Sequence, residues 1–299
     1  MPNVRLSGRL PLSPARKVAL GTWTRSGDPT ITGTLRLDAT AMVAWLTAAR
    51  ARTGRRITVT HIVAKLLADT LAEHPEVNVR LRLGGIHQRA DVAVFVHVAL
   101  RDPETGQLDL SGAILRDADQ KSLLELIDDA DARIARVRAG TDTELEKGRD
   151  TFRLLPGLVV PPLVRLLELL SVQLNLDLRF MGVARDPFGS VLLTNIGALG
   201  LDEAWAPLVP YSGVPIVVAL GALRDTPLVR DGEVVVVPVL PLYATLDHRV
   251  LDGAHAAKLA RSIRRRFADP AGWLGDPNDL PASALPPNPA IDPDRGGGA

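Results

Sequence analysis

The sequence predicts an α/β protein in which helices cover a largely mixed β-sheet. Several segments have the apolar spacing of amphipathic helices, for example at residues 62, 63, 66, 67 and 71. Several short runs rich in valine, isoleucine and leucine have the character of buried strands. Helices and strands do not alternate regularly along the chain, which favours an α/β sandwich with a mixed sheet over a regular parallel βαβ fold.

The first half of the chain is expected to contain an N-terminal arm, three helices and two strands. Residues 1–13 form the arm, and Pro14, with Ser13 as N-cap, begins the first helix, "PARKVALGTWTRS". The pattern then predicts a strand over 30–38, helices over 40–52 and 60–74, and a buried strand over 91–100.

The second half is expected to contain two long helices and four short strands. The first helix covers 119–138, with Asp119 as candidate cap and an apolar face formed by Leu123, Leu126, Ile127, Ala130, Ile134 and Val137. Strands are predicted over 190–195, 215–221, 233–240 and 242–246, and the last helix over 254–267. The tail, 276–299, is rich in proline, aspartate and glycine and is predicted to be disordered.

The composition is that of a globular protein with a substantial core, because 46% of the 299 residues are hydrophobic. The formal net charge is +1, so the total charge gives no indication of a nucleic-acid or membrane-surface protein. The absence of cysteine excludes thiolate nucleophiles, cysteine metal sites and disulfides. No signal-peptide-like run and no stretch of about 18 apolar residues occurs, so a cytoplasmic localisation is expected.

The strongest motif is "DHRVLDGAHAAKL" (247–259), which places a histidine, three residues, an aspartate and a glycine between a predicted strand and the last helix. A side chain at such a junction can point into a cleft, so His248 is the candidate general base. The alternative is a surface histidine at a helix start. The motif alone does not decide between them.

The chain resembles the catalytic domain of the 2-oxo acid dehydrogenase acyltransferases. Residues 247–259 match that family's signature almost residue for residue, and four more stretches follow the family's order: "LSPARKVAL" (12–20), "HPEVNVRL" (74–81), "GSVLLTNIGALG" (189–200) and "GVPIVVALGAL" (213–223). The resemblance implies a chloramphenicol acetyltransferase-like two-layer sandwich with a mixed sheet. It also implies one catalytic domain over residues 14–275.

Three features depart from the family pattern. The catalytic core begins almost at Met1, and none of the lysines, at positions 17, 65, 121, 147 and 258, has a lipoyl-hairpin context. A lipoyl group is therefore expected only in trans, on a separate lipoylated or acyl-carrier protein. The segment "GQLDLSGAIL" (106–115) replaces the family's "GLVVPVI", and an insertion occupies about 148–188.

The activity that the resemblance implies is transfer of an acyl group between coenzyme A and a thiol of the dihydrolipoyl type, or another acceptor, with no covalently bound cofactor. Such a transfer needs a base to take the thiol proton and donors to hold the oxyanion. By resemblance, His248 is the base, and Thr194 takes the place of the family's oxyanion-stabilising serine. The alternative for Thr194 is a strand-end threonine that bonds its own backbone.

Three residues and one partner are expected to support the site. By resemblance, Asp252 forms a buried ion pair that fixes the loop of His248, with Arg16 as the first candidate partner and Arg249 as the second. A plain N-cap is the alternative for Asp252. Gly253 is expected to allow a tight turn and Asn195 to shape the turn after Thr194. The other histidines, 61, 74, 87, 97 and 255, show no metal-ligand spacing, and His97 is interpreted as a core histidine.

The resemblance implies a homotrimer whose site takes the histidine from one chain and the hydroxyl from the next, without the large cubic or icosahedral cores. Within the insertion, Pro161 and Pro162 can open a helix from Leu163 to about Leu174 with only Arg165 and Glu168 as a polar strip. A helix so apolar must be covered. Packing against its own core or a neighbouring subunit is expected ahead of membrane contact through 154–180 or a protein partner.

Two other functions stay open at this point. A non-catalytic trimeric scaffold would keep the fold and lose the substrate channel. A membrane-associated acyltransferase would keep the chemistry and use a hydroxyl or amine acceptor.

Overall fold

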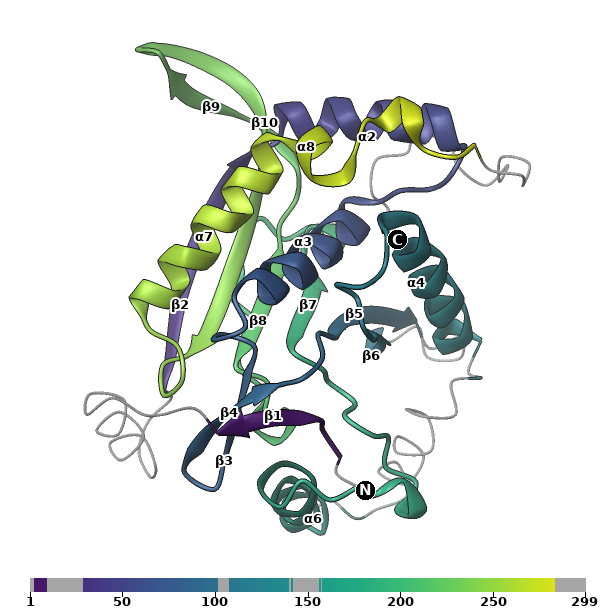
Figure 1. Cartoon of the computed structure of the whole chain (residues 1–299), viewed down its shortest axis with the longest axis vertical. Helices are drawn as coiled ribbons and strands as arrows, with labels where there is room; N and C mark the ends of the chain where they lie inside the picture. Colours follow the sequence, from purple (N-terminus) through teal and green to yellow (C-terminus); the bar gives the residue numbers. More distant parts are fainter. Residues whose placement is uncertain are drawn as a thin grey trace.

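A mixed β-sheet forms the centre of the molecule, as Figure 1 shows. The computed structural model describes residues 3–9, 29–101, 108–139, 141, 156 and 158–282. The strand order is β2-β10-β8-β7-β5-β6, in which β5, β7 and β8 run parallel and the other neighbours run antiparallel. The strands are β2 (Thr30–Asp38), β5 (Val94–Arg101), β6 (Leu108–Leu115), β7 (Val191–Asn195), β8 (Ile216–Leu220) and β10 (Glu233–Asp247).

One face of this sheet is covered by helices, which form the second layer of the sandwich. They are α2 (Thr40–Thr53), α3 (Val59–Glu73), α4 (Leu123–Arg138) and α7 (Gly253–Ala268), followed by the short α8 (Pro270–Leu274). Alternate strand residues such as Val94, Leu193 and Val218 point toward these helices and pack with Ile62, Leu126 and Phe267 in the main core.

The other face carries the remaining strand side chains and a thin cover. Phe95, Leu192 and Val217 form one small apolar cluster there, and Ile196, Ala219 and Tyr243 form a second. The chain from residue 204 to 209 packs over both clusters. Short helical turns η3 (Gly197–Leu199) and η4 (Pro210–Ser212) flank this cover.

A second, three-stranded antiparallel sheet in the order β1-β4-β3 lies below the main sheet in Figure 1. Its strands are β1 (Leu6–Arg9), β3 (Val79–Arg82) and β4 (Gly85–Arg89). Arg80 and Arg89 are buried and both bind the buried carboxylate of Asp186. This cluster ties the end of the insertion to the small sheet.

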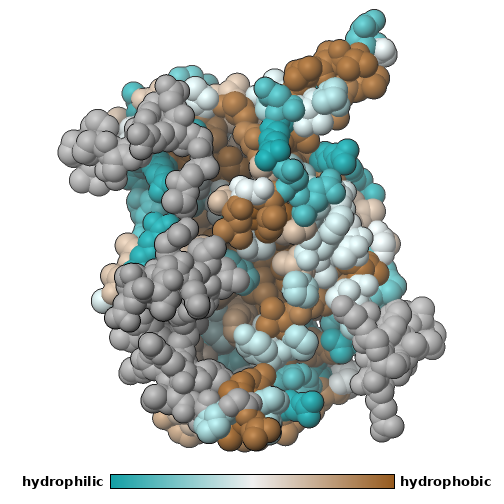
Figure 2. Space-filling model, turned by 180° about the vertical axis from the view of Figure 1, so that it is seen from behind, coloured by the Kyte–Doolittle hydropathy of each residue, from teal (hydrophilic) through white to brown (hydrophobic). Residues whose placement is uncertain are grey.

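The remaining strand, β9 (Arg224–Arg230), pairs with the first half of β10 and forms a hairpin that projects from the body. Figure 2 shows apolar surface on this hairpin, to which the exposed Val229, Val234 and Val236 belong. No helix among the described residues is long and apolar enough to cross a membrane.

Several predicted element boundaries were wrong. The segments 233–240 and 242–246 are one strand, β10, because its first half pairs with β9 and its second half with β2 and β8. Ser122, not Asp119, caps α4, in a capping box with Glu125. Disorder was predicted from residue 276 onward, but Leu280 packs on the main core and its carbonyl accepts from Arg52. The predicted helix at 14–26 lies outside the described residues.

Candidate active site

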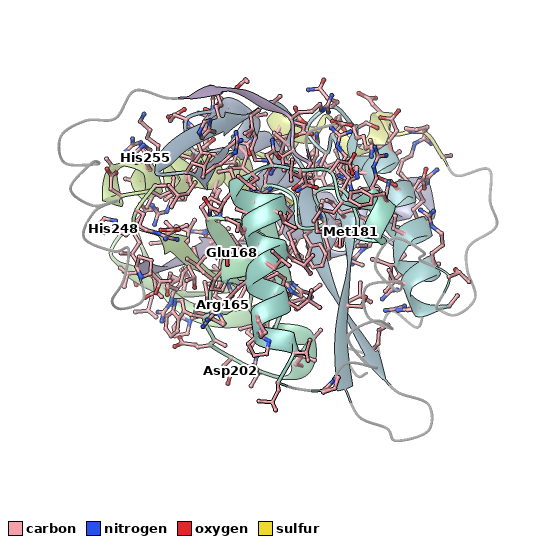
Figure 3. The ribbon with its side chains drawn as sticks, turned by 90° about the horizontal axis from the view of Figure 1, so that it is seen from below. Arg165, Glu168, Met181, Asp202, His248 and His255 are labelled. Atoms are coloured by element: carbon pink, nitrogen blue, oxygen red, sulfur yellow. The ribbon has the colours of Figure 1, made fainter. Side chains whose placement is uncertain are left out.

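His248 lies in a turn between β10 and α7 that backbone and side-chain bonds hold in place. Its own backbone N–H donates to the Pro29 carbonyl at 2.7 Å, and the N–H groups of Val250 and Leu251 donate to the Asp247 carbonyl. Figure 3 shows His248 and His255 on the same side of the molecule. The turn is therefore a fixed element that presents the His248 ring in one orientation.

The ring of His248 has one tautomer in its neutral form. Its Nδ1 lies 2.8 Å from the carbonyl oxygen of Leu251. A carbonyl only accepts, so Nδ1 carries the proton and Nε2 carries the lone pair. A neutral imidazole fixed in this way is suited to accept a proton at Nε2.

The carboxylate of Asp247 stabilises the same turn. It accepts from the Arg249 backbone N–H at 3.0 Å and forms a two-pronged ion pair with the Arg249 guanidinium, with a shortest distance of 2.7 Å. Arg249, the second candidate partner of Asp252, therefore binds Asp247. The hydrogen bonds with Asp247 raise the pKa of Arg249, and the charge of Glu168 acts in the same direction.

Asp252 is the N-cap of α7. Its side chain accepts from the backbone N–H groups of Ala254 and His255, and the His255 ring bonds back in a capping box. The Asp252 side chain is 40% exposed in a single copy of the chain, so the prediction that it is buried there was wrong. Arg16, its first candidate partner, lies outside the described residues.

Gly253 has no conformational need for glycine. Its φ is not positive, and a Cβ at this position would meet nothing within 4 Å. The expectation that Gly253 permits a tight turn was wrong, because the chain turns at residues 248–250, before the helix begins.

Thr194 lies near the carboxyl end of β7, on the face of the sheet away from the helices, and is half-buried. Within the described residues its hydroxyl makes no hydrogen bond, so the alternative of a threonine that bonds its own backbone is not seen. Asn195 shapes the next turn: its amide donates to Thr60 Oγ1 and accepts from the Ala198 N–H, both at 3.0 Å. Gly197 is needed because a Cβ would lie 2.5 Å from the Ala222 nitrogen.

The strand register separates Thr194 from His248 within one chain. Thr194 pairs with Ala219 on β8, and Ala219 pairs with Tyr243 on β10. His248 follows Tyr243 by five residues, which corresponds to about 16 Å along the strand direction. The two side chains cannot reach one substrate atom inside a single chain.

The insertion forms a surface helix, α6 (Val160–Glu168), that continues as a π-helical turn, Leu169–Gln173. No residue of α6 is buried, so its predicted packing into the chain's own core was wrong. The exposed apolar side chains of this segment are Leu158, Val159, Leu166, Leu169, Leu174, Leu176, Phe180 and Met181. Figure 3 shows Arg165 and Glu168 along the helix. Helix α6 packs against the turn η4, and the charge of Glu168 acts to raise the pKa of Arg249.

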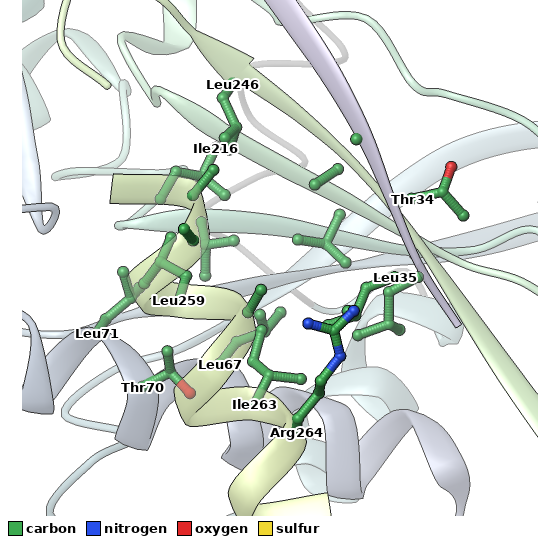
Figure 4. A pocket seen from close by; sticks show the side chains of 18 residues that line it. Thr34, Leu35, Leu67, Thr70, Leu71, Ile216, Leu246, Leu259, Ile263 and Arg264 are labelled. Atoms are coloured by element: carbon green, nitrogen blue, oxygen red, sulfur yellow. The ribbon is translucent and has the colours of Figure 1, made fainter. Parts of the chain in front are cut away.

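A cavity of about 300 Å³ lies on the other side of the sheet, between β2, β8, β10, α3 and α7 (Figure 4). Its lining is almost wholly apolar, with Thr34, Thr70 and Arg264 as the polar side chains. None of the predicted site residues lines it. Within the described residues no group of His, Cys, Asp or Glu is placed to hold a metal ion.

One further residue, His97, lies beside Thr194 on the face of the sheet away from the helices. His97 was interpreted as a core histidine, but it lies on β5 next to Thr194, half-buried, with Nδ1 3.3 Å from the Leu193 carbonyl. Strand alternation could have identified the face of the sheet on which His97 lies, but its place beside Thr194 follows only from the register of β5 with β7.

Comparison with known proteins points to one family. A model of the 2-oxoacid dehydrogenases acyltransferase (catalytic domain) matches residues 5–153 and 188–275. The dihydrolipoyllysine-residue acetyltransferase component of the acetoin cleaving system of Bacillus subtilis is 25% identical over 228 residues, which are 76% of this chain and 45% of that protein. The chain thus spans less than half of that relative's length.

Solved structures give the same result at the level of fold. A probable dihydrolipoamide acetyltransferase from Listeria monocytogenes has a TM-score of 0.60 at 17% identity, covering 88% of this chain and 95% of that one. The dihydrolipoamide acetyltransferase of Azotobacter vinelandii has a TM-score of 0.60 at 20% identity, with 89% and 93% covered. These likenesses confirm the predicted two-layer fold.

Proposed function

The chain belongs to the family of 2-oxoacid dehydrogenase acyltransferase catalytic domains, and on that premise we propose that it transfers an acyl group between coenzyme A and a thiol of the dihydrolipoyl type. The observation that carries the proposal is the His248 ring, fixed by Leu251 with its lone pair on Nε2. A thiol that reaches this nitrogen can give up its proton to it.

The proposed reaction has two steps. His248 Nε2 takes the proton of the acceptor thiol, and the thiolate attacks the thioester carbonyl to form a tetrahedral oxyanion. The Thr194 hydroxyl donates a hydrogen bond to that oxyanion. The intermediate then expels the thiolate of coenzyme A, which takes the proton back from His248. No proton or electron is left over.

The proposed residues resemble a set studied in a similar protein. In the Azotobacter vinelandii enzyme, crystallographic and enzymatic work has investigated the role of a serine, a histidine and an asparagine four positions after the histidine in the catalytic mechanism. In this chain Asp252 follows His248 by the same four positions, and a hydroxyl stands at Thr194. The departure from asparagine to aspartate adds a charge at the start of α7.

A homotrimer in which His248 of one copy faces Thr194 of the next would complete the site. The 16 Å separation within one chain supports such an assembly. So does the apolar surface on the face of the sheet away from the helices, seen in Figure 2. Exposed apolar side chains in this cover and in the segments next to it are Leu199, Leu201, Trp205, Tyr211 and Leu223. Native mass should be about 96 kDa, three times the 32.0 kDa of the chain.

The exposed side of α6 would be covered by a neighbouring copy at the edge of the same interface. Its packing against η4, whose Tyr211 is exposed on the same face, supports this cover over a membrane. Leu166→Asp with Leu169→Asp should abolish the trimer, whereas Arg165→Asp on the same helix should not. Leu170 is less suitable because it is half-buried against its own chain. Flotation of the wild type with liposomes, or a trimer that survives both substitutions, would reject this cover.

Asp252 would stabilise the His248 turn in two ways, as the cap of α7 and as an ion pair with Arg16. Asparagine caps a helix as well as aspartate does, so Asp252→Asn isolates the charge. A partly exposed pair contributes about 1 kcal/mol, less than a fully buried one. We expect Asp252→Asn to lose about that much stability and Asp252→Ala about 1 kcal/mol more. If Asp252→Asn had the same free energy of unfolding as the wild type, the ion pair would make no contribution, and Asp252 would act only as the cap of α7.

The decisive experiment incubates the protein with a panel of acyl-coenzyme A thioesters and dihydrolipoamide, and in parallel with hydroxyl and amine acceptors. It measures free coenzyme A and the acylated acceptor by chromatography, because transfer between two thiols leaves the total thiol unchanged. Transfer that depends on His248 supports the proposal. Transfer only to hydroxyl or amine acceptors would favour the membrane-associated alternative, and no transfer with any donor would favour the scaffold.

A further inference from the structure

His97 and Thr194 stand side by side on the face of the sheet that carries the proposed oxyanion donor. Strands β5 and β7 are parallel, with Val96 opposite Leu193. One residue further in the same register, His97 neighbours Thr194, and both side chains project away from the helices. Ala219 and Tyr243 continue the same row across β8 and β10.

The ring of His97 is wedged between an aromatic neighbour and the backbone of β7. Phe95 meets it edge-on, with ring centroids 5.0 Å apart. Phe95 in turn occupies the space over Gly112, where a Cβ would lie 2.0 Å from the Phe95 ring. Gly112 is opposite His97 on β6 and belongs to the segment 106–115 that departs from the family pattern. A side chain at 112 would force Phe95, and with it His97, to move.

The hydrogen bond of His97 falls on the peptide unit that carries Thr194. Nδ1 lies 3.3 Å from the Leu193 carbonyl, which accepts only, so Nδ1 is the donor. That carbonyl belongs to the peptide group whose nitrogen is Thr194's. Burial lowers the pKa of His97, so the ring is neutral at pH 7, although the bond to Leu193 acts in the opposite direction.

We propose that His97 is a positioning residue for Thr194: through the Leu193 carbonyl it fixes the end of β7, and with it the direction in which the Thr194 hydroxyl meets the oxyanion. The inference rests on the proposed acyl transfer and adds a residue to it. Oxyanion donors act only when they are held in place before the reaction, so a small displacement of Thr194 lowers the rate of the chemical step.

The test uses two amides of different length. In His97→Asn the amide nitrogen can take the place of Nδ1 and donate to Leu193, whereas in His97→Gln the amide lies nearer the place of Nε2. We expect His97→Gln and His97→Ala to lower kcat on the order of tenfold or more with KM for the acyl donor unchanged. His97→Asn should recover most of the loss, and His87→Ala, on β4 of the small sheet, should behave as wild type.

A double-mutant cycle with Thr194→Val separates positioning from general stability. If His97 acts through Thr194, adding His97→Ala to Thr194→Val should lower kcat no further. Equal effects of the Asn and Gln variants, a change confined to KM, or full additivity with Thr194→Val would each overturn the inference. Thermal unfolding of each variant shows whether it folds. If His97→Ala does not fold, the comparison of His97→Asn with His97→Gln decides whether His97 positions Thr194.

The two proposals fail in different ways. A wild-type chain that forms no acylated acceptor with any donor rejects the proposed function and this inference with it. A wild-type chain that transfers acyl groups, with His97→Ala and His97→Gln at wild-type kcat, rejects only the role of His97.

Discussion

At the scale of single residues, loss of the His248 base can be separated from loss of the turn that holds its ring. In His248→Asn the amide can still donate to the Leu251 carbonyl, so the turn keeps its bond while the base is lost. We expect this variant to lose about 10²- to 10⁴-fold in kcat, the usual contribution of a general base. Stopped assays of coenzyme A release measure the rate, and native mass checks the assembly. Activity within a few-fold of wild type would mean that another group takes the proton.

Thr194 gives a second residue-scale prediction. Thr194→Val removes the hydroxyl at nearly constant volume, so it should lower kcat by about 10² to 10³ while the fold is kept. Thr194→Ser keeps the hydroxyl and should be mild. Steady-state kinetics with acyl-coenzyme A distinguish the cases. A loss confined to the affinity for the acyl donor would remove Thr194 from the oxyanion role.

The sequence proposes these residues by their types, whereas their contacts come only from the structure. His248 and Thr194 could be proposed because the stretches 247–259 and 189–200 match the family's pattern in residue type. The partners of Asp252, by contrast, depend on side-chain distances that no spacing encodes, and Arg249 proved to bind Asp247. His97 was set aside because burial of a histidine has many causes, and only the register of β5 with β7 places it beside Thr194.

At the scale of elements, helices α3 and α7 are joined by one carboxylate. Glu73, at the end of α3, accepts from Ser262, Arg265 and Arg266 of α7. The hydrogen bonds with Arg265 and Ser262 lower the pKa of Glu73 from 4.5 to about 2. Because the folded state holds the carboxylate ionised, this stabilisation is present above pH 4.5 and is lost as the pH falls toward 2.

Glu73→Gln should therefore reduce stability at neutral pH and not in acid. We expect a loss of about 1 kcal/mol at pH 7, the scale of a partly exposed ion-pair network. The difference from wild type should shrink between pH 4.5 and pH 2. Denaturant unfolding over this range measures it, with Glu233→Gln on the exposed hairpin as control. A difference that is constant with pH would mean that the charge of Glu73 does not contribute.

Elements with a strong internal pattern were predicted well, and elements defined by their partners were not. Helix α7 was expected over 254–267 and runs from Gly253 to Ala268, because its apolar stripe and cap are local. The three strands of the small sheet were missed, since each is short and gains its pairing from distant segments. Two strands, 233–240 and 242–246, were predicted where the structure has β10, with a break at Pro241. The strand continues because other strands pair along its whole length.

At the scale of the whole molecule, the fold leaves the proposed chemistry incomplete. Thr194 lies on the sheet and His248 directly follows β10. His248 is five positions after Tyr243, the β10 residue in the same row as Thr194, so the two are separated along the strand direction. The face that carries Thr194 also exposes Trp205, Tyr211 and neighbouring leucines. Both observations are explained if a second copy brings its His248 turn to this face, as in a closed cyclic assembly with one shared site per interface.

Mixing two inactive variants tests this arrangement directly. His248→Asn keeps Thr194, and Thr194→Val keeps His248, so neither homotrimer has an intact site. When equal amounts are dissociated and reassembled together, a site shared between copies is intact when its histidine comes from one variant and its threonine from the other. With random assembly this holds for about a quarter of the sites in a cyclic trimer. The mixture should therefore recover about a quarter of wild-type coenzyme A formation from acyl-coenzyme A, whereas each variant treated alone recovers none. Continued inactivity of a mixture shown by native mass spectrometry to contain both chains would place His248 and Thr194 in separate roles.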